Sequence, residues 1–92
     1  MKQGLFSVTR SEFFGRQAET LFGGGPNADM ALEALEWVLE RKPQHGVFVP
    51  DSPELQAVPI HHLGEEYLVI YRANLPKRTI ELLGLQKSTV DE

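Results

Sequence analysis

Two apolar runs near the end of the chain constrain the fold more than any other feature of the sequence. The first covers residues 67–72 and the second residues 79–86, with Pro76 in the short turn between them. Both are rich in Val, Ile, Leu and Tyr, and both are too short for a stable isolated helix, which is typical of strands buried on at least one face. The sequence therefore predicts an antiparallel hairpin with strands at 65–74 and 78–86.

Length and composition indicate one cytoplasmic domain. We expect the 92 residues to form a single unit, 1–92, because two cores would each bury too little apolar area to offset about 1–2 kcal/mol of backbone entropy per residue. No run of roughly 18 apolar residues is present, so no membrane span or membrane partner is expected. The chain has no cysteine and no apolar core of signal-peptide length near its start, which fits a reducing cytoplasm.

The charge of the chain is acidic overall and uneven along the sequence. The net charge is −4, whereas proteins that grip nucleic acid through its phosphates normally carry a basic excess. Residues 72–89, however, contain four basic side chains and a single acid, Glu81. The basic residues are Arg72, Lys77, Arg78 and Lys87. Two interpretations stay open, a local basic patch and a set of charges that keeps hairpin edges soluble.

The first half of the chain predicts a strand followed by two helices. A short strand is expected at 5–8, and Thr9 stands three residues before Glu12, the spacing of a capping box, so a helix should begin near Arg10. Its apolar stripe would be Phe14, Ala18, Leu21 and Phe22, and the run Gly23-Gly-Gly-Pro26 should end it.

Asn27 is the expected N-cap of the second helix, and Asp29 would lie in its first turn. The helix should end at Arg41-Lys42, because Pro43 cannot continue it. Its expected apolar stripe is Leu32, Leu35, Val38 and Leu39, with Trp37 flanking it. The short connection predicts that the two helices form an antiparallel hairpin.

A strand at 47–49 should follow, and then Pro50, Pro53 and Pro59 indicate an irregular or edge segment up to Leu63. Gly84 should mark a β-bulge or a close backbone approach in the last strand. The predicted fold is α+β, in the order β-α-α-β-β-β, with an antiparallel sheet that carries the helical hairpin on one face and leaves the other face open.

This order of elements resembles the RelE/ParE superfamily of toxins from bacterial type II toxin–antitoxin pairs. Two further segments carry the resemblance, Glu36-Trp-Val-Leu-Glu-Arg-Lys-Pro43-x-x-Gly46 and Tyr67-Leu-Val-Ile-Tyr-Arg72 ahead of a strand rich in Ile and Leu. The resemblance implies a RelE/ParE-like domain and a growth-inhibiting cytoplasmic protein. It also implies a cognate antitoxin as partner, and the ribosome with its messenger RNA or DNA gyrase as target.

The chain departs from the pattern of the branch that cleaves messenger RNA. The resemblance implies lysines or arginines on the second strand, an arginine inside the strand at 67–72, and a basic residue with a tyrosine or histidine near the chain end. The segment 43–71 contains no Lys or Arg, Leu68 stands where the arginine in the strand is expected, and only Lys87 remains beyond the hairpin. Ribosome-dependent cleavage, action on gyrase and a non-cleaving toxin all stay open.

The candidate catalytic residues are Arg72, Lys87 and His62. Cleavage of RNA through its 2′-hydroxyl needs a base, an acid and cationic donors for the developing charge, and histidine can move either proton near neutral pH. His61 and His62 cannot both face one site in an extended segment, because successive side chains alternate in direction.

No metal or cofactor is expected. His45, His61 and His62, with Glu65 and Glu66 nearby, lack the spacing of a zinc site. The glycines at 23–25 lack the Gly-Lys-Ser/Thr of a phosphate-binding loop.

A second hypothesis is a non-catalytic domain of the same fold that binds a partner protein or forms a homodimer. It rests on the acidic balance and the missing catalytic set. Two interpretations of Arg72 also stay open, a specific carboxylate or phosphate partner bound by its planar fork and an ion pair with a helix glutamate such as Glu36 or Glu40. Tyr67, Tyr71 and Phe48 allow two interpretations, base stacking on the open face of the sheet and core packing.

Overall fold

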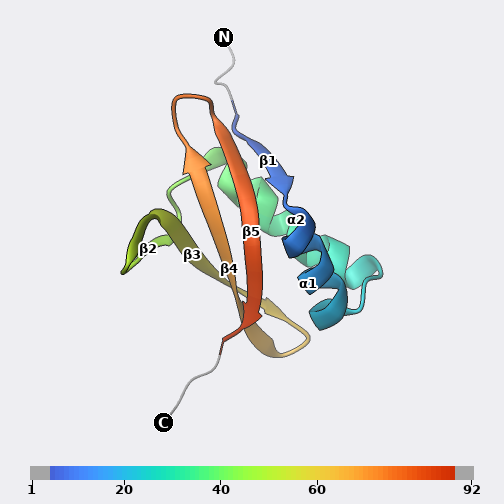
Figure 1. Ribbon diagram of the computed structural model, residues 1–92. Coiled ribbons are helices and arrows are strands. Elements are labelled where there is room, and N and C mark those ends of the chain that lie inside the picture. The colour runs from blue at the N-terminus through green and yellow to red at the C-terminus, as the bar shows by residue number, and fades with distance from the viewer. Residues whose placement is uncertain (1–4, 89–92) are drawn as a thin grey trace.

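Two helices lie against one face of a five-stranded sheet in the computed structural model, which describes residues 5–88 (Figure 1). The elements, in chain order, are β1 Ser7–Arg10, α1 Glu12–Phe22, α2 Pro26–Arg41, β2 Val47–Val49, β3 Ser52–His62, β4 Glu65–Asn74 and β5 Thr79–Lys87. The predicted α+β class, with the helices on one face, is confirmed. No helix in residues 5–88 has the length and hydropathy needed to cross a membrane.

The sheet is mixed, in the order β1-β5-β4-β3-β2. The strands β2 to β5 pair with their neighbours in antiparallel fashion, but β1 runs parallel to β5, with Ser7 opposite Thr79. The expectation of a wholly antiparallel sheet is therefore corrected. The two helices connect β1 to β2 and cross one face of the sheet. This connection lets β1 pair with the edge of β5 that faces away from β4. The strand also starts later than expected, because the Phe6 N–H donates to the Glu40 carbonyl at 3.1 Å instead of joining the sheet.

The helices begin at other caps than the sequence suggested. Ser11, and not Thr9, caps α1, since its hydroxyl accepts a hydrogen bond from the Phe14 N–H at 3.0 Å, while Thr9 belongs to β1. Helix α2 starts one residue before the expected cap Asn27, because Pro26 occupies the first turn, where its missing N–H is not needed. The predicted ends are confirmed at Arg41 and at Gly23, whose φ of 79° allows the left-handed cap.

The core lies between the helices and the covered face of the sheet. It comprises Phe14, Ala18 and Phe22 of α1, Ala28, Leu32, Leu35 and Leu39 of α2, and Val58, Tyr67, Val69, Tyr71, Ile80, Leu82 and Leu85 of the strands. Most of both predicted stripes is therefore buried. Leu21 and Trp37 are exposed, which places them at the outer side of their helices.

The strand β3 is the main difference from the sequence-based expectation. Residues 52–62 form a regular strand, not an irregular segment, and Pro59 lies within it opposite Leu68 of β4. The pairing of β3 with β2 reaches no further than Ala57, so beyond that residue the outer side of β3 is an edge. Proline is tolerated at a strand edge because its missing N–H removes no ladder hydrogen bond there.

The predicted β4–β5 hairpin and its bulge are confirmed. Ile70 faces Gly84 and Tyr71 faces Leu82, which leaves Leu83 as the extra residue of the bulge. Helix α1 holds this irregular stretch through two side chains. The Gln17 Oε1 accepts a hydrogen bond from the Leu85 N–H at 2.7 Å, and the Ser11 hydroxyl donates to the Leu83 carbonyl at 3.4 Å.

Candidate functional site

The strands β3 and β4 separate at one end of the sheet and form a fork. Their ladder ends where Gln56 faces Tyr71, although β3 begins four residues earlier at Ser52 and β4 continues to Asn74. The first part of β3 pairs with β2 instead. Strand β2 and this first part of β3 together form an arm, which points away from β4 (Figure 1).

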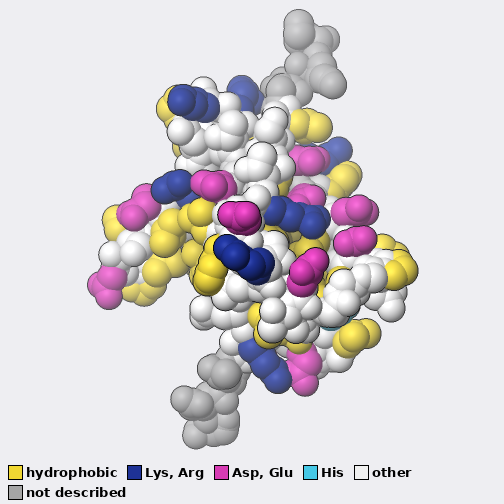
Figure 2. All heavy atoms as spheres, turned by 45° about the vertical axis from the view of Figure 1, so that its right-hand side comes forward, with side chains coloured by type: hydrophobic (Ala, Val, Ile, Leu, Met, Phe, Trp, Pro, Cys, Tyr) yellow, Lys and Arg dark blue, Asp and Glu magenta, His cyan; other side chains and the backbone are white. Residues whose placement is uncertain are grey.

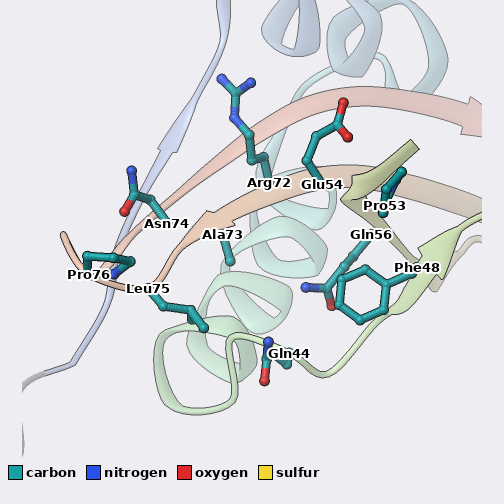
Figure 3. Close-up of a pocket in the computed structure, with 10 residues that line it drawn as sticks. All are labelled: Gln44, Phe48, Pro53, Glu54, Gln56, Arg72, Ala73, Asn74, Leu75 and Pro76. Atoms are coloured by element: carbon teal, nitrogen blue, oxygen red, sulfur yellow. The ribbon is translucent and has the colours of Figure 1, made fainter.

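A groove of about 360 Å³ lies in this fork. It is lined by the loop before β2, the arm, the end of β4 and the following turn, through Gln44, Phe48, Pro53, Glu54, Gln56, Arg72, Ala73, Asn74, Leu75 and Pro76. Figure 3 shows that Phe48, Leu75 and Gln44 point to one side of the fork, whereas Arg72 and Glu54 point to the other. The groove therefore has one side that is apolar apart from Gln44, and a charged rim.

A buried hydrogen-bond network fixes the floor of the fork. The Tyr71 hydroxyl donates to Oε1 of Gln56 at 2.9 Å and accepts from the Gly46 N–H at 2.8 Å. Burial raises the pKa of the Tyr71 phenol above its ordinary value of 10.0, against a smaller opposing effect of the Gly46 N–H. A Cβ at Gly46 would lie 2.7 Å from the Ala57 carbonyl oxygen and 2.9 Å from the Tyr71 hydroxyl. Only glycine therefore lets the loop close on this tyrosine.

Arg72 forms an ion pair across the sheet and not with a helix. Its Nη2 lies 3.0 Å from Oε1 of Glu81, which stands opposite it on β5. The expected partners are engaged elsewhere, Glu36 with Arg10 and Glu40 with Arg41. The expectation of a helix carboxylate was wrong because Arg72 lies on the face of the sheet that the helices do not cover.

Lys87 and His62 lie at the other end of the hairpin. The Nζ of Lys87 is 3.3 Å from Oε1 of Glu65, which stands opposite His62 in the ladder. The His62 side chain is buried, with its ring centroid 4.3 Å from that of Phe22. His62 thus packs against α1.

The structure does not bring the three candidate catalytic residues together. Lys87 stands opposite Tyr67 of β4, and Arg72 lies five residues further along that strand, a distance of about 17 Å at about 3.4 Å per residue. The two positions also belong to opposite faces, because Tyr67 is buried under the helices and Arg72 is exposed. A catalytic role for Arg72, Lys87 or His62 stays a prediction.

The remaining charges do not form a basic surface in the view of Figure 2. There the Lys and Arg side chains are scattered among Asp and Glu side chains. The described residues contain no group of three or more His, Asp or Glu side chains that could hold a metal ion. Tyr67 and Tyr71 belong to the core, so of the three aromatic candidates for stacking only Phe48 is exposed.

Sequence reasoning missed Gln56 and Glu54, both of which line the groove. The prolines around them predicted an irregular segment, so neither residue was assigned to a strand or a face. Gly46 gave a usable signal, since a lone glycine between a helix end and a strand often marks a close backbone approach.

Comparison with protein-family models and with curated proteins gives no match for this chain. Among solved structures, it is similar to a chain in the crystal structure of the archaeal RelE–RelB complex from Pyrococcus horikoshii OT3. The TM-score is 0.61 at 20% sequence identity, over 90% of this chain and 94% of that chain. The similarity covers nearly the full length of both chains, and the predicted RelE-like fold is confirmed.

Proposed function

We propose that this chain is the toxin of a type II toxin–antitoxin pair and that a cognate antitoxin binds it in the cytoplasm. The observation that carries the proposal is the fold, which is shared over nearly the whole length with a chain from a RelE–RelB complex. The two segments that carry the sequence resemblance also lie together in the structure, where the Gly46 N–H donates to the Tyr71 hydroxyl.

We further propose that the toxin inhibits growth by binding its target, DNA gyrase or the ribosome, and not by cleaving messenger RNA. Cleavage needs a base, an acid and cationic donors around one phosphate. Arg72 and Lys87 each pair with a carboxylate and lie at opposite ends of the hairpin. Leu68 stands between them, on the same face of β4 as Arg72.

The experiment that tests toxicity is controlled expression in a bacterial host. Induction of the chain should arrest growth, and co-expression of the adjacent open reading frame should restore it and yield a complex that co-purifies. The matched control is the same gene with an early stop codon, which separates toxicity from the burden of expression. Normal growth at a verified level of folded protein would refute the proposal.

The mode of action needs a separate assay. Purified protein should leave messenger RNA on translating ribosomes intact. A gyrase-directed toxin should inhibit DNA supercoiling, and a ribosome-directed one should slow translation. Ribosome-dependent cleavage that is abolished by Arg72→Ala would overturn the proposed binding mechanism and identify Arg72 as catalytic.

The second candidate function is a non-catalytic interaction domain of the same fold that binds a partner or forms a homodimer. It is favoured by the net charge of −4 and by the carboxylate partners of Arg72 and Lys87. This function predicts harmless expression together with a stable complex or dimer, which light scattering after size-exclusion chromatography would detect.

A further inference from the structure

We infer that the fork between β3 and β4 is a docking site for an extended peptide segment of a partner protein, with alternating apolar and basic side chains. The inference does not rest on the proposed toxicity, because it follows from the backbone, the side chains and the charges of the fork itself.

The backbone of the fork favours an extended occupant. Residues 72–74 of β4 pair with β5 on one side only, since the ladder with β3 has ended at Tyr71. Residues 52–55 of β3 likewise have no partner toward β4. Strand edges of this kind present alternating N–H and C=O groups, which an added peptide strand satisfies with its own backbone.

The apolar side of the groove favours a hydrophobic side chain at alternate positions of that peptide. Phe48 is 57% exposed and Leu75 is 46% exposed, and both line the groove. Pro53 and Pro76 add apolar surface. Burial of such surface stabilises a complex by about 25 cal/mol per Å². Because side chains alternate along a strand, one set would reach this side and the other set the charged rim.

The charge around the fork favours basic residues in the second set. The arm carries Asp51 and Glu54 and no Lys or Arg, because the segment 43–71 has neither. Glu54 has no cationic partner within residues 5–88, whereas Arg72 at the same rim is paired with Glu81. Among the side chains that line the groove, the unpaired charge is therefore the negative one of Glu54, while the cation Lys77 lies beside Arg72 and Asn74 outside the lining. Such a rim repels phosphates, which argues for a peptide and against RNA as the occupant.

Binding of a model peptide to the full chain tests this inference. The probe is a fluorescein-labelled hexapeptide, Val-Lys-Val-Arg-Val-Lys, titrated against the protein at low salt. We expect saturable binding with a dissociation constant below about 1 mM. Nuclear magnetic resonance shifts should concentrate at residues 47–56 and 72–76. Absence of binding at that concentration, or shifts confined to the helices, would overturn the inference.

Two variants with matched controls locate the contact. Phe48→Ala should weaken binding roughly five- to tenfold, whereas Trp37→Ala, which removes an aromatic ring that is also 57% exposed but lies on α2, should leave it unchanged. Glu54→Lys should weaken binding of the basic peptide roughly three- to tenfold and allow binding of Val-Glu-Val-Asp-Val-Glu. Glu33→Lys, on the exposed surface of α2, should do neither.

Equal effects of each variant and its control would refute the assignment of the site, because general electrostatics or hydrophobicity would then explain the binding. Thermal unfolding of every variant verifies that it is folded. The outcome is independent of the growth assay, since a harmless protein can bind the peptide and a toxic one can fail to do so.

Discussion

The hydrogen bonds of Tyr71 provide a direct test of what stabilises the fork between β3 and β4. Tyr71→Phe keeps the ring in the core but removes a hydroxyl that both donates to Gln56 and accepts from Gly46. Gln56 is 3% exposed, so its amide oxygen has little access to water once the hydroxyl is gone. The loop before β2 also loses its hydrogen bond from the Gly46 N–H to a side chain of β4.

The expected loss follows from the two bonds. Each neutral hydrogen bond contributes about 1 kcal/mol net, and a buried group left without a partner costs about 1–3 kcal/mol. We therefore expect the free energy of unfolding to fall by about 2–3 kcal/mol, with a decrease in Tm of about 8–24 °C for a domain of this size. Urea denaturation followed by circular dichroism measures the change.

Tyr67→Phe is the matched control for this experiment. Tyr67 is also a core tyrosine of β4, but its hydroxyl makes no hydrogen bond within residues 5–88. Its replacement should change stability by less than about 0.5 kcal/mol. If the two substitutions have equal effects, the network does not stabilise the fold and the role given to it is wrong.

Four further outcomes are expected. Because the pKa of Tyr71 is raised in the folded state, folding favours its neutral form. The contribution of Tyr71 to stability should therefore be complete below pH 10.0 and be lost as the pH rises above that value. Measurements of unfolding against pH should show a smaller fall for Tyr71→Phe. Leu39→Ala should cost about 2–5 kcal/mol in urea denaturation, because Leu39 is fully buried in α2. Ser11→Ala should cost about 1 kcal/mol in the same assay by removing the cap of α1. Arg72→Ala should change the free energy of unfolding by less than about 1 kcal/mol, since its ion pair with Glu81 is exposed.

Periodicity in the sequence predicted the parts of the fold that depend on local pattern. The spacing of apolar residues correctly predicted that Phe14 and Leu39 are buried in the core. Two runs rich in Val, Ile, Leu and Tyr, on either side of a turn with a proline, correctly predicted the β4–β5 hairpin. Helix ends were predictable where glycine or proline fixes the backbone. Helix starts were less so, because Thr9 and Ser11 are both competent caps and only the pairing of β1 with β5 decides between them.

The strand β3 and the candidate site could not be predicted in the same way. Prolines argue against a strand on local grounds, and the edge that tolerates Pro59 exists only because β2 is short. The sequence did not show which face of the sheet the helices cover, so it gave no means of placing Arg72 on the uncovered face. The choice of Glu81 as its partner depends on the ladder register beyond the bulge. The fork itself arises from where two ladders end, which no local pattern encodes.

The parallel pairing of β1 with β5 has a consequence for how the molecule is made. Ser7 and Thr79 are neighbours in space although they are far apart in the sequence. During synthesis, β1 leaves the ribosome long before its partner exists, so the sheet cannot be completed until β5 has been translated. Contacts between such distant segments also slow folding. A binding partner made at the same time would therefore meet a chain that still lacks its final strand.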